Sequence, residues 1–241
     1  MHGADEPMAA LLEVNQIQTS IGQYRILDGV TLQVEEGSIT ALLGRNGAGK
    51  TTTLTSILGL TPPRGGEIRF AGESLRGRRT FQIAQRGIGY VPEHRAVFRD
   101  LTVAENLQLA ERQRGDLRRR GDLIFALFPR LHERLHQKGG TLSGGEQQML
   151  AIARALVPEN RLLLIDEPSE GLAPVIIEQM MAAIQQLSAH TTVLLVEQNF
   201  RMASAISQRY SIVDDGRTVH AGAMSALRQN KPLIQSYLGA A

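Results

Sequence analysis

The chain has 241 residues, 42% of them hydrophobic and 21% charged, which are ordinary values for a globular protein and exclude wholesale disorder. Its formal net charge of +2 is too small to indicate a nucleic-acid-binding protein. The sequence contains no cysteine, which excludes disulfide scaffolds, thiolate metal sites and cysteine nucleophiles.

The N-terminal segment 1–14 is acidic and lacks the basic and apolar regions of a secretory signal. No apolar run approaches the roughly 18 residues that a membrane-spanning helix needs. We therefore expect a soluble intracellular protein that does not cross a membrane by itself.

The first half of the chain begins with strands and continues with helices. Three short strands are predicted over residues 12–20, 29–34 and 38–44. Glycines supply the breaks next to them, at Gly22, Gly29 and Gly37. A helix is predicted over 50–60 and a strand over 67–70. A helical region then spans 101–138, with interruptions at Gly115, Gly121 and Pro129.

The second half alternates regularly between helices and strands. Helices are predicted over 146–157, 175–189 and 200–207. Strands are predicted over 162–165, 191–197 and 210–213. The turn at Asp214-Asp215-Gly216 starts a last hairpin, and a short helical tail follows. This alternation implies a mainly parallel sheet covered on both faces, so the predicted fold class is α/β.

The pattern predicts one domain over residues 1–241. Its core, which includes an antiparallel β part on the N-terminal side, comprises 11–92 and 156–223. A helical subdomain, 93–155, is interpreted as an insertion on that core, and 224–241 form a C-terminal helical tail. The chain has no internal repeat, low-complexity segment or linker.

A glycine-rich loop between the predicted strand 38–44 and the helix 50–60 matches the pattern GxxxxGK(S/T). Its residues are Gly44, Arg45, Asn46, Gly47, Ala48, Gly49, Lys50 and Thr51. Glycines let backbone N–H groups close around phosphate oxygens at a helix N-terminus. Lys50 can reach the β- and γ-phosphates and the Thr51 hydroxyl can bind Mg²⁺. We predict a nucleoside triphosphate site that includes Thr52; the alternative is a plain strand-to-helix turn.

Two carboxylates, Asp166 and Glu167, end the apolar strand 162–165. A parallel strand delivers such residues to the carboxyl edge of the sheet, where α/β proteins bind ligands. Asp166 would hold hydrated Mg²⁺, and Glu167 would orient and deprotonate the attacking water. The alternative is an acidic pair that opens the turn at Pro168.

The segment Leu142-Ser143-Gly144-Gly145-Glu146 fits a helix capping box, S-x-x-E, which is its plain structural interpretation. Two glycines in a first helical turn cost up to about 1 kcal/mol each relative to alanine. They are expected where the backbone approaches an anion closely at a helix N-terminus. We interpret the segment as a second phosphate-binding surface, used when two copies of the chain face each other head to tail.

With these motifs the sequence resembles the ATP-binding cassette (ABC) ATPases. GRNGAGKT is similar to their Walker A motif, LLLIDE to Walker B and LSGGE to the signature. VPE at 91–93, PSEGLAP at 168–174 and VEQN at 196–199 match the Q-loop, D-loop and switch loop in order. The resemblance implies a P-loop NTPase, RecA-like core that hydrolyses ATP with Mg²⁺. It also implies that ATP lies between one subunit's Walker A and the partner's Ser143, Gly144, Gly145 and Glu146.

Within that family the sequence looks most like the ATPase subunits of bacterial branched-chain and hydrophobic amino-acid importers. GIGYVPE at 87–93, LTVAENL at 101–107 and LFPRL at 127–131 carry this resemblance, together with the SYLG tail. Importers of urea and short amides are close alternatives because they share GRNG and the pair Glu170-Gly171. An exporter ATPase and a soluble, non-transport ABC protein are further alternatives.

Three positions depart from the usual family pattern. Glu93 replaces the Q-loop glutamine and can still offer oxygen to Mg²⁺, although it adds negative charge. Gln198 replaces the switch histidine; its amide can hydrogen-bond the γ-phosphate but cannot carry a proton. Ile21 stands where an aromatic residue usually stacks on the base, and Tyr24 or an aliphatic surface is the alternative.

The partners follow from the same resemblance. It implies a second ABC ATPase subunit, either another copy or, as the family favours, a related cassette. It also implies membrane-spanning permease subunits that dock on 95–138, and a periplasmic binding protein that acts indirectly. The expected location is the cytoplasmic face of the bacterial inner membrane, with the chain bound peripherally and with no nucleic-acid partner.

Overall fold

Two sheets organise the computed structural model, which describes residues 10–239. The antiparallel sheet has the order β2-β1-β4-β5 and consists of β1 (Ala10–Ile21), β2 (Tyr24–Glu35), β4 (Gly65–Phe70) and β5 (Glu73–Ser74). The larger sheet has the order β10-β9-β3-β8-β7-β6 and consists of β3 (Ile39–Leu43), β6 (Ile88–Val91), β7 (Leu162–Asp166), β8 (Thr192–Glu197), β9 (Arg209–Asp214) and β10 (Arg217–Ala223). All its pairs are parallel except β9–β10. The predicted mainly parallel α/β sheet is therefore confirmed.

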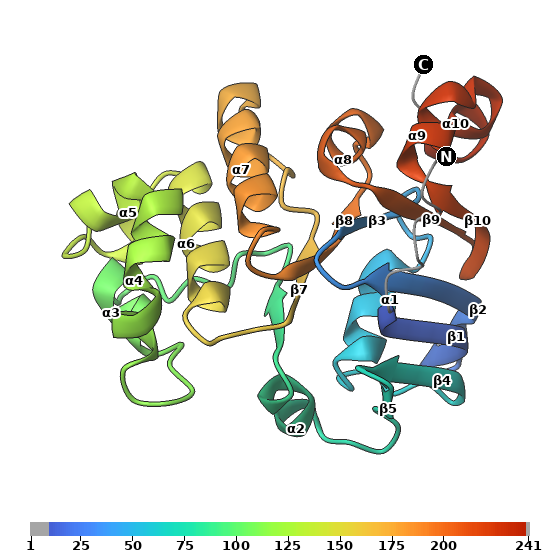
Figure 1. The fold of residues 1–241 in the computed structure, drawn as a ribbon, viewed down its shortest axis with the longest axis horizontal. Coiled ribbons are helices and arrows are strands. Elements are labelled where there is room, and N and C mark those ends of the chain that lie inside the picture. Colours follow the sequence, from blue (N-terminus) through green and yellow to red (C-terminus); the bar gives the residue numbers. More distant parts are fainter. Residues whose placement is uncertain (1–9, 240–241) are drawn as a thin grey trace, which may run out of the picture.

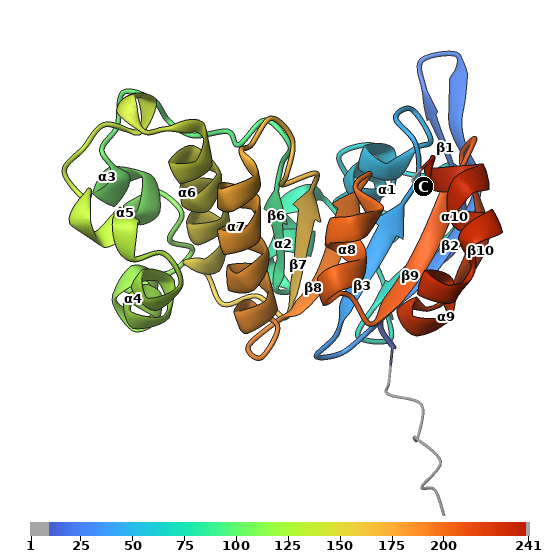
Figure 2. The same ribbon diagram turned by 90° about the horizontal axis from the view of Figure 1, so that it is seen from above.

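Helices cover both faces of the larger sheet. On one face α1 (Lys50–Ile57) packs in an apolar core shared with the antiparallel sheet, with α2 (Thr80–Gln85) at its edge. The other face carries α7 (Pro174–Leu187), α8 (Phe200–Ile206), α9 (Met224–Gln229) and α10 (Lys231–Leu238). Figure 2 shows these helices standing side by side over the strands. The strands between them are buried on both sides, which explains their continuous apolar runs.

A separate helical lobe extends from one end of the larger sheet (Figure 1). It comprises α3 (Val103–Gln108), α4 (Asp116–Leu127), α5 (Pro129–Glu133), the 3₁₀ turn Gly139–Thr141 and α6 (Gly144–Leu156). The apolar residues of α6 belong to the same core cluster as those of α7. The lobe is therefore joined to the sheet by packing and not by a flexible linker.

Two predicted glycine breaks are wrong. Gly29 lies inside β2, where a φ of 121° lets the strand continue although a Cβ there would come within 3.1 Å of Gln16 Oε1. Gly121 lies inside α4, where it is buried and faces Phe125 at ordinary contact distance. Gly29 is thus explained by the close approach of β1, whereas Gly121 is accommodated inside α4 despite the low helix propensity of glycine. α6 also begins at Gly144, two residues before the predicted start.

Within the described residues no helix is both long enough and apolar enough to span a membrane.

Candidate nucleotide site

The loop between β3 and α1 has the close backbone approach that its glycines imply. A Cβ on Gly44 would come to 2.3 Å from the carbonyl oxygen of Val213, so only glycine fits there. Gly49 is the N-cap of α1 with a φ of 108°, in the left-handed region that favours glycine. No side chain caps this helix start. Its first N–H groups are therefore left for an anion.

Lys50 is the first residue of α1, directly after the loop, and is almost fully buried. Its Nζ donates to the carbonyl oxygens of Gly44 and Arg45 at 2.9 and 3.0 Å. The same Nζ forms an ion pair with Glu167 Oε1 at 3.0 Å. The cation and the carboxylate, which are 117 positions apart in the sequence, are thus brought together at the carboxyl edge of the sheet.

A cavity of about 360 Å³ opens above this pair. The predicted loop residues Asn46, Gly47, Gly49, Lys50, Thr51 and Thr52 line it, together with Ile26, Glu93, Glu167 and Glu170. The walls therefore offer backbone donors and one cation on one side, and carboxylates on the other. This arrangement suits a triphosphate accompanied by a cation better than a free anion.

Asp166 and Thr51 lie in contact, and each has a side-chain oxygen of the kind that binds Mg²⁺. The Thr51 hydroxyl donates to Asp166 Oδ1 at 3.3 Å, and the Tyr90 hydroxyl donates to Oδ2 at 3.4 Å. Asp166 is fully buried, and this burial raises its pKa above the ordinary value. Within residues 10–239 no group of three or more His, Cys, Asp or Glu side chains could hold a metal. Mg²⁺ usually takes one or two protein oxygens plus phosphates and water, so Thr51 and Asp166 fit that ion.

Glu167 has an unusual backbone conformation at the end of β7. Its φ of 42° lies in the left-handed region, which is costly for a residue with a Cβ. The backbone N–H donates to the carbonyl oxygen of Val196 at 3.0 Å, which fixes the turn against β8. This turn directs the carboxylate into the cavity toward Lys50, where it could act on a water molecule.

Glu93 is placed at the cavity as predicted, among other carboxylates. Burial and the neighbouring Glu170 raise the pKa of Glu93 above its ordinary value, and the charge of Glu167 adds to this effect. Adding the negative charge of a triphosphate to this wall requires compensation by a cation. The arrangement is consistent with a role for Glu93 as an oxygen ligand of Mg²⁺.

Glu197 is a buried carboxylate that sequence analysis did not identify. It ends β8, and its oxygens accept hydrogen bonds from Ser169 Oγ at 3.0 Å, Ser169 N at 3.3 Å and Asn199 N at 3.4 Å. Burial, only partly offset by these hydrogen bonds, raises the pKa of Glu197 to about 7. Glu197 thereby ties the loop after Glu167 to the loop that carries Gln198.

Replacing Glu197 with glutamine should flatten the pH dependence of stability. The unfolded carboxyl ionises near 4.5 and the folded one near 7, so the free energy of unfolding should fall by up to about 3 kcal/mol as the pH rises between these pKa values. Urea unfolding at about pH 5 and pH 8 measures this fall in the wild type and in Glu197→Gln. Glu178→Gln, on the exposed side of α7, is the control and should keep the wild-type dependence. An equal fall in Glu197→Gln would contradict the assignment.

Several predicted residues do not line this cavity. Ile21 lies at the end of β1 and is 52% exposed, whereas Ile26 on β2 reaches the cavity. Gln198 is exposed just after β8. The segment Ser143–Glu146 begins α6 in the helical lobe. Within the described residues of one chain, therefore, the segment Ser143–Glu146 and the phosphate loop do not line the same pocket.

The N-terminus of α6 has the predicted capping box. Ser143 Oγ accepts a hydrogen bond from Glu146 N at 3.3 Å, and the Glu146 carboxylate accepts one from Ser143 N at 2.9 Å. Packing also requires glycine at position 145, which the sequence alone did not show. A Cβ there would meet Ile176 Cγ2 of α7 at 2.5 Å. The close approach of α7 is therefore a second reason for glycine at position 145, besides the anion binding that the sequence predicts.

Comparisons with known proteins agree with this geometry. The ABC transporter family model matches residues 27–170, which contain both the phosphate loop and the α6 segment. The high-affinity branched-chain amino acid transport ATP-binding protein BraG of Pseudomonas aeruginosa is 43% identical over 95% of this chain and 100% of its own length. The lipopolysaccharide export system ATP-binding protein LptB of Escherichia coli is 34% identical over 96% of this chain and 98% of its own. A solved ATP-binding subunit of an ABC transporter superposes with a TM-score of 0.80 at 30% identity, over 95% of this chain and 96% of its own.

Proposed function

The chain belongs to the ABC transporter family as an ATP-binding subunit with ATPase activity, and on that premise we propose that it drives a bacterial importer of branched-chain or hydrophobic amino acids. The similarity to BraG over the whole chain supports this substrate class. The observation that carries the chemistry is the ion pair of Lys50 and Glu167, 3.0 Å apart in a cavity that Thr51 also lines, with Asp166 buried behind Thr51 and accepting its hydroxyl hydrogen bond.

The residues of the cavity divide the work of hydrolysis between them. Lys50 would leave the carbonyl oxygens and Glu167 to bind the β- and γ-phosphates, which compete for it as stronger anions. Glu167, freed from Lys50, would accept a proton from the water that attacks the γ-phosphate. Mg²⁺, held by Thr51 and Asp166, would supply charge neutralisation of the phosphate oxygens. Gln198 would donate its amide hydrogen to the γ-phosphate.

A second cassette would complete the site. The α6 N-terminus lies in the helical lobe and, within the described chain, does not line the phosphate cavity. We propose that a facing subunit contributes its own Ser143–Glu146 segment to the nucleotide held here. The facing subunit would be a second copy of this chain or, as the resemblance favours, a related cassette.

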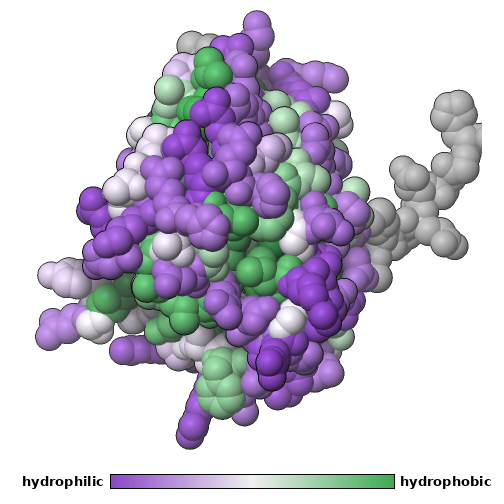
Figure 3. Space-filling model, turned by 90° about the vertical axis from the view of Figure 1, so that its left-hand side faces the viewer, coloured by the Kyte–Doolittle hydropathy of each residue, from purple (hydrophilic) through white to green (hydrophobic). Residues whose placement is uncertain are grey.

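The helical lobe would dock on the membrane-spanning permease subunits, at the cytoplasmic face of the inner membrane. Seen end-on in Figure 3, this side of the molecule is mostly polar but exposes an apolar area near its middle. Two large apolar side chains are exposed here: Phe98, in the segment before α3, is 47% accessible, and Leu109, just after α3, is 61% accessible. Such apolar exposure on a polar surface is typical of contact sites for other proteins.

Uptake measurements test the substrate class. Deleting the gene from its native bacterium should abolish high-affinity uptake of radiolabelled leucine, and a plasmid copy should restore it. A Glu167→Gln copy should not restore it, because the transporter would lack its hydrolytic step. Loss of urea uptake with leucine uptake intact would overturn the amino-acid proposal in favour of a urea importer. An outward transport defect alone would favour an exporter, to which the similarity with LptB points.

A further inference from the structure

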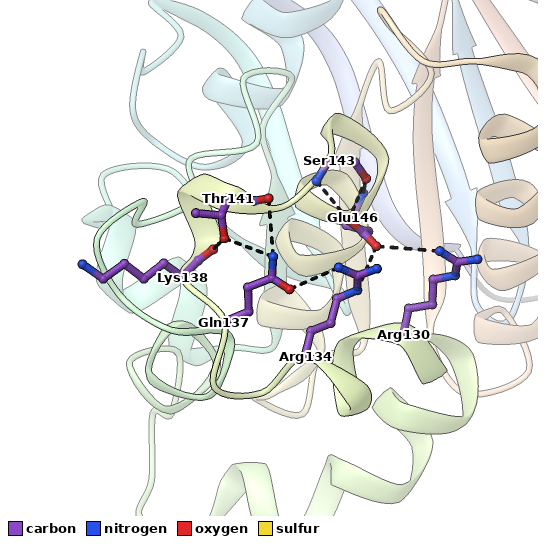
Figure 4. A network of polar contacts seen from close by, with 7 residues as sticks. All are labelled: Arg130, Arg134, Gln137, Lys138, Thr141, Ser143 and Glu146. Carbon is purple, nitrogen blue, oxygen red and sulfur yellow. Dashed lines mark hydrogen bonds and ion pairs between the residues drawn. The ribbon is translucent and has the colours of Figure 1, made fainter.

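A polar network surrounds Glu146 at the start of α6 (Figure 4). The residues are Arg130, Arg134, Gln137, Lys138, Thr141, Ser143 and Glu146. Glu146 is buried, and its two oxygens have different partners. Oε2 accepts hydrogen bonds from Ser143 N and Oγ at 2.9 and 2.8 Å, whereas Oε1 lies 3.1 Å from Arg134 Nε.

The hydroxyl of Ser143 is committed in this arrangement. A hydroxyl has one hydrogen, and Ser143 donates it to Glu146. Ser143 Oγ therefore has no hydrogen left for a phosphate oxygen until it turns away from Glu146. The carboxylate itself is a second obstacle. Burial raises its pKa, but hydrogen bonds from Ser143 and the charges of Arg134 and Arg130 outweigh this and leave the pKa of Glu146 below its usual value. It is thus a negative charge beside a proposed anion site.

Arg134 is the cation best placed to offset that charge. Its side chain is 34% exposed, whereas Arg130 is 65% exposed and lies 3.9 Å from the same oxygen. Arg134 Nη1 also donates to Gln137 Oε1 at 3.1 Å, and Gln137 Nε2 donates to Thr141 Oγ1 at 3.1 Å. The guanidinium is therefore oriented by the turn that leads into Ser143. This makes it more than an isolated surface ion pair.

We infer that Arg134 is a positioning residue for the nucleotide held by the facing subunit. It retains the Glu146 carboxylate and offsets its charge, so that the Ser143 hydroxyl can turn from Glu146 to the γ-phosphate. Arg134 itself does not touch the nucleotide. This inference rests on the proposed function, because it requires that a second subunit present its phosphates to α6.

A double-mutant cycle tests this role in the full chain. The background is Glu167→Gln, in which MgATP should hold two chains together, and the readout is the MgATP concentration at half-maximal dimer by sedimentation. Arg134→Gln should raise that concentration about tenfold, the size expected for one charged hydrogen bond. Arg134→Lys should restore most of the loss. Arg118→Gln, exposed on α4, is the matched control and should leave the concentration unchanged.

The decisive arm adds Glu146→Gln, which removes the charge but keeps an oxygen for the cap. In that background Arg134→Gln should change the midpoint by less than about twofold, because no carboxylate remains to be offset. An unchanged tenfold effect would show that Arg134 supports the fold only and would overturn the inference. If the Arg134→Gln chain dimerised at the same MgATP concentration as its parent, the inference would also be overturned, whereas the proposed function would stand. The inference takes the facing subunit to be a second copy of this chain. If the Glu167→Gln chain remained monomeric in MgATP, two copies would not share a nucleotide, and the inference would be overturned together with the second-copy form of the proposed function.

Discussion

Glu167→Gln should lower ATP turnover by about a hundredfold or more while ATP still binds. An amide cannot take a proton from the attacking water, so the loss concerns the chemical step. Binding should persist or become tighter, because the ion pair between Glu167 Oε1 and Lys50 Nζ, now 3.0 Å long, competes with the phosphates for the lysine. Phosphate release at saturating MgATP and calorimetry of nucleotide binding measure the two effects separately.

The same variant should accumulate an ATP-bound dimer, since the state before hydrolysis would no longer decay. Size-exclusion chromatography with MgATP should show that dimer, and MgADP should not produce it. Glu178→Gln, an exposed carboxylate on α7, is the control and should keep normal turnover. Hydrolysis at the wild-type rate in Glu167→Gln would remove Glu167 from the role of the base.

Those parts of the site that are contiguous in the sequence could be predicted well. The strand, loop and helix around Lys50 follow one another directly, and the apolar strand 162–165 leads directly into Asp166 and Glu167. Parallel strands bring their carboxyl ends to one edge, so the meeting of these two segments also followed from the strand order. The capping box at Ser143 was local in the same way.

Contacts made by tertiary packing could not be predicted in this way. Tyr90 reaches Asp166 because β6 pairs with β7, and the register of that pair is not visible in either segment. Glu197 meets Ser169 only because β8 lies beside β7. Gly145 is required by the approach of α7, not by its own helix.

The hairpin of β1 and β2 is a further case. Ile21, the predicted base-stacking position, ends β1 and is exposed, whereas the antiparallel pairing carries Ile26 of β2 to the cavity. The sequence signal for Ile26 is its position as an apolar residue on β2, two positions before Asp28. The spacing alone does not say which strand faces the cavity.

Lys50→Ala should remove most of the nucleotide affinity. Lys50 is the cation that lines the phosphate cavity, and without it three carboxylates, Glu93, Glu167 and Glu170, would face the triphosphate unopposed. Calorimetry should show ATP binding weakened by at least about tenfold. Lys231→Ala, exposed on α10, should bind ATP normally. Unchanged affinity in Lys50→Ala would contradict the assignment of the phosphate loop.

Ser143→Asp is the complementary change on the other half of the proposed site. Aspartate caps a helix about as well as serine. It would lie against the Glu146 carboxylate, whose charge Arg134 partly offsets, so circular dichroism and urea unfolding serve as the control that α6 stays folded. The negative charge of the aspartate would face the γ-phosphate of the opposite subunit and repel it. Each variant alone should therefore lack activity, one because it cannot hold ATP and the other because it cannot complete the partner's site.

Mixing the two inactive variants tests most directly whether two chains share each nucleotide. In a mixed pair, the Ser143→Asp chain supplies an intact phosphate loop and the Lys50→Ala chain supplies an intact α6 N-terminus, so one of the two sites is whole. Random pairing should then restore about one quarter of the wild-type ATPase rate. A mixture no more active than its separate components, or full activity of Ser143→Asp alone, would contradict the account.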